Sequence, residues 1–366
     1  MRVLATFACS LLLGSAVLGL SARGAERTNV DGWNPKAAAS YLDARAEWWT
    51  SWPNAARDHG TFCVSCHTAV PYLLARSSLR TALAERDRTP AEIRIADNVA
   101  KRVALWKELA PLYSDQRSGL PKTSESRGTE AILNALVLAS RDAADKRLTD
   151  DTRTALANLW ALQMKTGPLN GTWAWLNFKY EPWESNDGPF YGATLAAMAI
   201  GLAPEGYASG PAVQDGVKAL NSYIQKELRN QPDMNRLMAV WAATRLATVM
   251  APDERRSTIN DILAKQQADG GWSMSLLGPY KRLDGTTLDS ASDGYATALV
   301  TLVAQEAGFT SDSRVQKGLD WLKRNQDPQT GRWLASSLNK QRDPATDAGR
   351  FMSDAATALA VMSLAR

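Results

Sequence analysis

The feature that most constrains the fold of this chain is an internal repeat near its C-terminus. QQADGGW is followed by SDGYATALV, and NQDPQTGRW is followed by MSDAATALAV. In both copies a segment with helical periodicity ends at Gln, and a Gly-containing turn leads to Trp. An Asp then follows 21 residues later, from Trp272 to Asp293 and from Trp333 to Asp354. Agreement of both spacings indicates a repeated structural unit rather than chance.

Four looser copies precede this pair. NGTW before FYGATLAAMAIGLA forms one, HGTF before PYLLARSSLR forms another, and two more keep only the pairing of helices. The second helices are rich in Ala, Thr and Gly, whereas the first are amphipathic with Lys and Arg outside. Helical hairpins cannot bury their faces singly and must stack. The sequence therefore predicts an all-α ring of six inner and six outer helices, with inner helices starting near positions 67, 129, 187, 234, 293 and 354.

The segment KGLDWLKRNQDPQTGRW, residues 317–333, and its shorter partner QQADGGW resemble the Gln–Trp repeats of the squalene-hopene cyclase and prenyltransferase superfamily. The resemblance implies an α/α toroid over residues 25–366 as a single domain. It also implies that Trp173, Trp272 and Trp333 are packing residues that tie each outer helix to its neighbour.

The chain departs from that superfamily at the positions that carry chemistry. LDSASDGYATA places Asp289 and Asp293 where the cyclases have closely spaced aspartates, and it has no adjacent pair. The zinc of protein prenyltransferases needs a Cys ligand, and no Cys occurs after Cys66. We therefore expect this chain to share the fold of that superfamily but not its activity.

Residues 1–24 are typical of an export signal, with Arg2 before an apolar run from Val3 to Leu20 and small residues near Gly24. Cys9 lies inside that run without a lipoprotein context, and an uncleaved membrane anchor is the alternative. We therefore expect a periplasmic or secreted protein whose mature chain does not insert stably into the membrane. Net charge is +4, and no basic block occurs, so a nucleic-acid partner is not expected.

The motif that most directly indicates chemistry is CVSCH, residues 63–67, the attachment pattern of c-type haem. It predicts one covalent haem c, with thioethers from Cys63 and Cys66 and with His67 as the proximal iron ligand. Two alternatives remain. The cysteines can form a disulfide or a thiol redox pair, or they can bind zinc together with His59 and His67.

The sequence alone does not identify the sixth ligand of the iron. If the ring closes, its sixth unit lies beside the first, which makes Met352 the tentative distal ligand. Met274 and His59 are the other candidates. If none of them ligates, an open iron position favours ligand binding or oxygen chemistry over electron transfer.

Acidic residues recur at the predicted starts of the inner helices: Glu130, Asp187, Asp293 and Asp354. Helix capping is the favoured explanation, and catalysis is the alternative. An aromatic group lines a pocket or belongs to the core: Trp173, Trp175, Tyr180, Trp183, Phe190 and Tyr191.

The main functional prediction is an exported haem protein in electron transfer or haem redox chemistry, with an unidentified redox partner and an apolar small-molecule ligand. The alternatives are a haem-free cyclase-like or lyase-type toroid enzyme using Asp187, Asp293 or Asp354, and a binding scaffold without catalysis.

Overall fold

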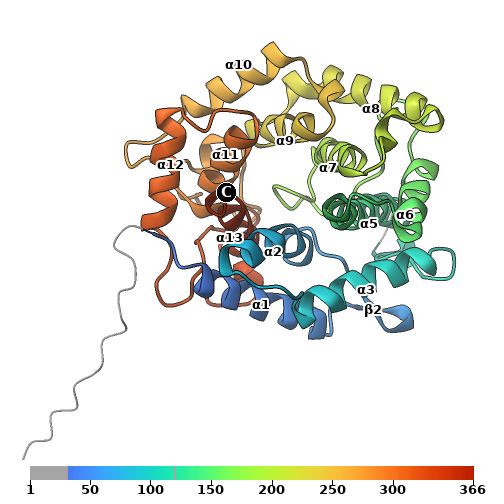
Figure 1. The fold of residues 1–366 in the computed structure, drawn as a ribbon, viewed down its shortest axis with the longest axis horizontal. Coiled ribbons are helices and arrows are strands. Elements are labelled where there is room, and N and C mark those ends of the chain that lie inside the picture. The colour runs from blue at the N-terminus through green and yellow to red at the C-terminus, as the bar shows by residue number, and fades with distance from the viewer. Residues whose placement is uncertain (1–31, 119–120) are drawn as a thin grey trace, which may run out of the picture.

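The protein is an α/α toroid, drawn in Figure 1 from a computed structural model that describes residues 32–118 and 121–366. The inner ring consists of α2 (Ala69–Leu83), α5 (Lys122–Asp145), α7 (Gly188–Leu202), α9 (Asp233–Arg245), α11 (Gly294–Glu306) and α13 (Phe351–Leu364). The outer ring consists of α1 (Pro35–Ser51), α3 (Pro90–Ala104), α6 (Asp150–Ala161), α8 (Gln214–Glu227), α10 (Pro252–Leu263) and α12 (Ser313–Arg324). Each inner helix contacts the next, and α13 contacts α2, which closes the ring.

Short elements connect these helices. They comprise a two-stranded antiparallel sheet of β1 (Ala56–Arg57) and β2 (Thr61–Phe62), the single turn α4 (Asp115–Ser118), and several 3-10 turns. The 3-10 turns are η1 (Asp58–Gly60), η2 (Tyr207–Ser209), η3 (Pro211–Val213), η4 (Leu228–Asn230), η5 (Ala247–Val249), η6 (Met274–Leu276) and η7 (Ala348–Arg350).

The two rings differ in composition for a packing reason. In α11 and α13 nearly every residue is buried, and small Ala and Thr side chains let neighbouring inner helices approach closely. In α12 only one face is buried, through Val315, Trp321 and Leu322 together with Gly318, while its Lys and Arg residues lie outside. The predicted six hairpins and their order are therefore confirmed.

The predicted inner-helix starts agree with the structure to within about three residues, except at α5. That helix begins at Lys122, seven residues before the predicted position 129. The polar segment KTSESRG forms its first turns because tertiary contacts hold it. The Lys122 ammonium donates to Glu125 and to the backbone carbonyl of Asn177, and the close approach of Ala174 requires a glycine at position 128.

The Gln–Trp turns link neighbouring units in the same way three times. Each turn's Gln amide donates to the carbonyl of its own turn glycine and to a backbone carbonyl at the start of the next outer helix. Gln163 reaches Gly216, Gln266 reaches Arg314, and Gln326 reaches Asn34, at 2.7–3.0 Å. The last of these bonds joins the sixth unit to the first.

The tryptophans of these turns donate their indole N–H groups back to the preceding outer helix. Trp173 bonds the carbonyl of Leu159, Trp272 that of Ile262, and Trp333 that of Leu322. All three indoles are fully buried. The prediction that they are packing residues is confirmed.

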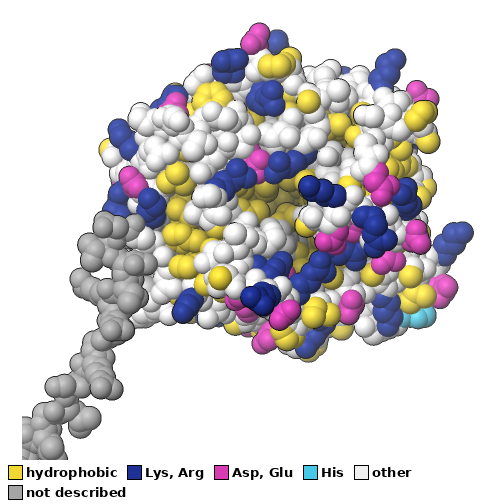
Figure 2. All heavy atoms as spheres, viewed as in Figure 1, with side chains coloured by type: hydrophobic (Ala, Val, Ile, Leu, Met, Phe, Trp, Pro, Cys, Tyr) yellow, Lys and Arg dark blue, Asp and Glu magenta, His cyan; other side chains and the backbone are white. Residues whose placement is uncertain are grey.

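The face of the ring drawn in Figure 2 is hollowed at its centre, where hydrophobic side chains gather and charged side chains surround them. Among the helices of the described residues, none has an apolar stretch long enough to cross a bilayer. The predicted export signal and its cleavage region lie outside the described residues.

Candidate functional site

One mouth of the toroid holds a cavity of about 210 Å³, which we call the mouth cavity. It lies where α2, α7 and α13 begin, because their first residues or the loops before them supply its walls. Its aromatic walls are Trp49, Trp52, Tyr113, Tyr180, Trp183 and Phe351, and its polar groups include His67, Glu181, Glu184, Asn339 and Arg342.

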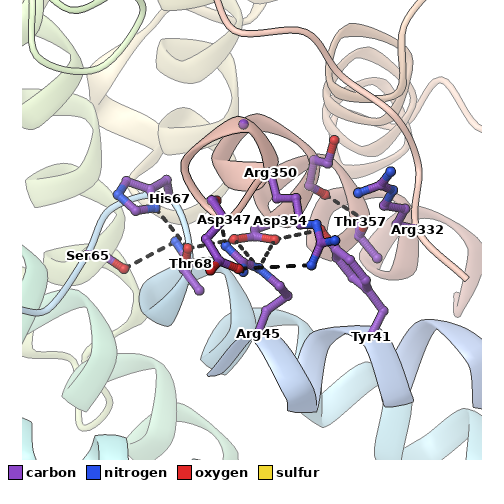
Figure 3. Close-up of polar contacts among 12 residues, drawn as sticks. Tyr41, Arg45, Ser65, His67, Thr68, Arg332, Asp347, Arg350, Asp354 and Thr357 are labelled. Atoms are coloured by element: carbon purple, nitrogen blue, oxygen red, sulfur yellow. Dashed lines mark hydrogen bonds and ion pairs between the residues drawn. The ribbon is translucent and has the colours of Figure 1, made fainter. Parts of the chain in front are cut away.

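His67 is oriented by a buried chain of hydrogen bonds that leads to Asp354 (Figure 3). The Thr68 hydroxyl donates to Asp354 at 2.8 Å and lies 2.8 Å from His67 Nδ1. A hydroxyl has one proton, so His67 Nδ1–H must be the donor to Thr68. Nε2 of His67 therefore carries the lone pair and acts as a hydrogen-bond acceptor.

Asp354 is held by two further donors, both from α1. Tyr41 Oη donates at 2.7 Å and Arg45 Nε at 2.8 Å, while Arg45 also pairs with Asp347 at 2.7 Å. Arg45 and Asp354 are almost completely buried. This network joins the first unit of the ring to the last.

The imidazole of His67 is packed among aromatic rings. Phe351 stacks on it at 3.9 Å between ring centroids, Trp49 meets it edge-on at 5.0 Å, and Trp183 lies at 6.0 Å. Burial, with a smaller contribution from the charge of Arg45, lowers the pKa of His67 to about 3. The ring is therefore neutral at physiological pH and is a weak base.

The two cysteines are separate thiols in the structure. The carbonyl of Cys63 accepts the Trp49 indole N–H at 2.8 Å, and Cys66 lines the mouth cavity. Burial raises the pKa of Cys63 to about 11 and that of Cys66 well above its usual value. Both thiols are therefore protonated near neutral pH and are not activated nucleophiles.

Glu184 is the acidic group whose environment differs most from that of an ordinary surface carboxylate. An antiparallel bridge places it, because its backbone N–H and carbonyl both bond the backbone of Tyr180. Burial raises the pKa of Glu184 to about 7, against a smaller lowering by Lys122. No described residue donates a hydrogen bond to its carboxyl group. A second carboxyl, Glu181, lines the same cavity, and burial raises its pKa too.

The four acids singled out from the sequence have different roles. Asp293 caps α11, accepting from the backbone N–H of Ala296 and also from that of Met274, so capping is confirmed there. Capping is wrong for two others, because Glu130 pairs with Arg102 and Asp354 with Arg45, all within the protein interior. Asp187 stands at the N-cap position of α7 without a side-chain capping bond.

The aromatic group predicted from the sequence divides among three environments, and Phe190 is among its buried core members. Tyr180 and Trp183 line the mouth cavity, whereas Trp173 and Trp175 donate to backbone carbonyls in the core. Tyr191 lines a small apolar space of about 40 Å³ between the inner helices, which we call the central cavity.

The candidate sixth-ligand residues are also separated. Met352 lines the mouth cavity with Cys66 and His67, as ring closure predicts. Met274 is buried beside Asp293, and His59 is exposed in η1, where its carbonyl accepts from Lys101.

Comparison with known proteins identifies the fold. No family model and no curated protein matches the chain. Solved structures do match. A structure described as UGL with dGlcA-Glc-Rha-Glc has a TM-score of 0.55 at 10% identity, over 90% of this chain and 96% of its own. A possible member of the GH105 family from Salmonella enterica serovar Paratyphi A has a TM-score of 0.52 at 9% identity, over 97% and 98%. What they share with this chain is the α/α toroid.

A possible GH105 member from Klebsiella pneumoniae aligns over 98% of both chains at 11% identity, with a TM-score of 0.47. Of the earlier resemblance to cyclases and prenyltransferases, the toroid is confirmed by the two structures with TM-scores of 0.55 and 0.52.

The prediction of a covalent haem c is contradicted, and with it the predicted c-type cytochrome function and electron transfer. Of the two matching toroids above, one is described as UGL with dGlcA-Glc-Rha-Glc and the other as a possible GH105 member, and neither is described as a haem protein. Within residues 32–118 and 121–366, no group of three or more His, Cys, Asp or Glu side chains is arranged to hold a metal ion, which also overturns the zinc alternative. Locally, protein aromatic rings occupy the space around the His67 imidazole.

The sequence analysis missed Glu181 and Glu184, the acids that line the mouth cavity. The available signal was their position in YEPWES, beside two aromatic residues of the predicted pocket. The haem assigned to Cys63, Cys66 and His67, with Met352 as its tentative distal ligand, is therefore wrong. The disulfide or thiol-redox alternative for the two cysteines stays a prediction.

Proposed function

We propose that this chain is an exported, haem-free toroid enzyme, with residues 25–366 as one domain, that cleaves a sugar-like substrate by acid–base chemistry. The observation that carries the proposal is Glu184: an unpaired carboxyl with a pKa of about 7, facing a cavity with aromatic walls. A carboxyl tuned to this pKa is protonated often enough near neutral pH to donate a proton to a leaving oxygen.

The cavity's composition supports a polar ring as the substrate. Aromatic faces pack against the apolar faces of a sugar ring, while amide, guanidinium and carboxyl groups bond its hydroxyls. Asn339, Arg342 and Glu181 supply such groups here. One toroid of the same fold is described with dGlcA-Glc-Rha-Glc, a chain of sugars.

The roles of the chain's residues follow from their protonation. Glu184 gives its proton to the leaving oxygen as the glycosidic C–O bond breaks. Glu181 is the second carboxyl: it takes a proton from the water whose oxygen forms the new bond to the sugar carbon. His67, with a pKa of about 3, is too weak a base to take the substrate's proton. Its Nε2 instead accepts a hydrogen bond from a substrate hydroxyl or water and fixes its position.

A terpenoid-cyclase-like reaction has less support. The central cavity is apolar but holds only about 40 Å³, against about 210 Å³ for the mouth cavity. Of the three acids that such a reaction was expected to use, Asp293 and Asp354 are bonded within the protein, whereas Asp187 has no side-chain capping bond.

The test is the Glu184→Gln variant against a panel of oligosaccharides, beginning with dGlcA-Glc-Rha-Glc and scored as release of reducing sugar. We expect kcat to fall by about 10²–10⁴-fold, the usual contribution of a general acid. Wild-type activity should decline as pH rises through about 7, because the donor loses its proton there. Glu108→Gln, at an exposed carboxyl, is the matched control and should be unchanged.

A second readout needs no substrate. Difference infrared spectra of wild type and Glu184→Gln should show a protonated carboxyl that disappears between pH 6 and 8.

The pKa of Glu184 in the folded protein is raised above that in the unfolded chain, so Glu184 destabilises the fold as pH rises from 4.5 towards 7. Over that range Glu184→Gln should therefore gain stability relative to wild type. A carboxyl that is ionised throughout, or full activity in the variant, refutes the assignment.

A further inference from the structure

The opposite mouth of the toroid, where the inner helices end, carries a second hollow. It consists of two adjoining cavities of about 210 and 110 Å³ that share Leu74, Ser77 and Ser140. We call it the far-mouth hollow. Residues from the last turns of the inner helices line it, so it is separate from the mouth cavity where those helices begin.

The floor of this hollow is apolar and continues into the protein. Leu74, Met198, Trp241 and Met362 line both the far-mouth hollow and the central cavity. Leu202 and Leu302 extend the apolar wall outward. An apolar chain entering from this mouth would therefore remain in contact with apolar side chains along its length.

The rim of the far-mouth hollow is basic. Five arginines and two glutamates line its two cavities, an excess of three positive charges: Arg80, Arg88, Arg141, Arg245 and Arg366 against Glu92 and Glu306. In the mouth cavity, by contrast, Arg342 faces two glutamates. The far-mouth hollow is therefore the more basic of the two ends of the ring.

Much of the basic rim has a structural explanation. A cation at the end of a helix offsets the helix dipole. Four of the five arginines also form ion pairs: Arg80 with Glu92 at 2.5 Å, Arg245 with Glu306 at 2.6 Å, Arg141 with Asp142 at 3.0 Å, and Arg366 with Glu306. Arg88 does not fit this explanation. It immediately precedes Thr89, the N-cap of α3, where a positive charge is unfavourable, and it forms no ion pair or hydrogen bond with any described residue.

We propose that the far-mouth hollow binds a single-chain amphipathic anion, such as a medium-chain alkyl carboxylate. The unpaired guanidinium of Arg88 faces the anionic head, with the excess charge of the rim behind it. The alkyl chain lies along Leu74 and Met198 towards the central cavity. An apolar floor beside the unpaired Arg88 matches this ligand class better than a small anion, which leaves the floor bare, or a neutral lipid, which leaves Arg88 without an anionic partner.

The test is isothermal titration calorimetry of the full chain with monomeric alkyl carboxylates below their micelle concentrations. We expect one bound decanoate per chain. Each added methylene should tighten binding by about fourfold from butanoate upward, until the hollow is full. Decan-1-ol, which has the same chain without the charge, should bind at least fivefold more weakly.

Two variants locate the site. Arg88→Ala should weaken decanoate binding at least fivefold, whereas Arg256→Ala, at an exposed arginine on the outer helix α10, should leave it unchanged. Leu202→Trp, which fills the hollow from its half-buried edge, should abolish binding while the far-ultraviolet circular dichroism spectrum stays native.

Four outcomes overturn the proposal: no decanoate binding by the wild type, equal affinity for butanoate, equal affinity for decan-1-ol, or equal effects of the two arginine variants. Binding to phosphatidylglycerol vesicles without binding of monomeric decanoate overturns it as well, since it identifies a membrane-contacting surface instead. None of these outcomes depends on whether Glu184 catalyses a reaction.

Discussion

At the scale of single residues, Asp354 is the acid on which the hydrogen bonds that orient His67 converge. It accepts from Tyr41, Arg45 and Thr68, and through Thr68 it sets the orientation of His67. Asp354→Asn leaves the buried Arg45 without its buried countercharge, so that only the half-exposed Asp347 still pairs with it. We expect a loss of about 3–5 kcal/mol in the free energy of unfolding, measured by urea denaturation.

Asp320→Asn is the matched control, because Asp320 is exposed and pairs only with Lys323. It should cost less than about 1 kcal/mol. Similar losses in both variants would mean that the Asp354 network is no stronger than a surface ion pair.

Sequence reasoning at this scale identified positions better than roles. Asp354 was singled out by its spacing from Trp333, yet its partners lie some 300 residues away in α1, and no local pattern shows them. Glu184 had no such spacing. The raised pKa of Glu184 comes from its burial among aromatic side chains of other repeat units. Burial of a single carboxyl depends on the tertiary fold, which no local pattern shows.

At the scale of elements, the closure of the ring depends on the turn glycine Gly331. Its φ is +76°, and a Cβ there would lie 2.3–2.4 Å from the backbone of Ala37 in α1. Gly308, with φ of +90°, has no atom within 4 Å of such a Cβ. Both substitutions to alanine impose the strain of a left-handed backbone, about 1–2 kcal/mol.

We therefore expect Gly331→Ala to cost about 1–3 kcal/mol more than Gly308→Ala, as measured by thermal unfolding, because only the former also forces a steric overlap. Equal costs would show that α1 and the sixth turn separate easily.

The elements themselves were the most predictable part of the molecule. Repeated Gln, Gly and Trp at fixed spacing predicted the turns, and small-residue helices predicted the inner ring. The early start of α5 was missed, because the bonds that hold its first turn come from Glu125 and from the distant Asn177. Propensity alone does not extend a helix into such a polar segment.

At the scale of the whole molecule, the ring differs from an open stack of repeats because it has no end unit. In an open array, terminal repeats contact one neighbour and can unfold first. Here α13 contacts both α1 and α2, so the first and last units each have neighbours on two sides. Unfolding any unit therefore removes packing from two others.

Weakening the seam should consequently lower the stability of the entire ring. We expect Gly331→Ala to unfold in one transition, at lower urea than wild type, with coincident curves from far-ultraviolet circular dichroism and tryptophan emission. The Trp33–Trp333 contact, 6.1 Å between ring centroids, lies at the seam and makes emission sensitive to its opening. An early change in emission before helix is lost would mean that the seam opens as an independent unit, and that the toroid behaves as an open array whose ends happen to touch.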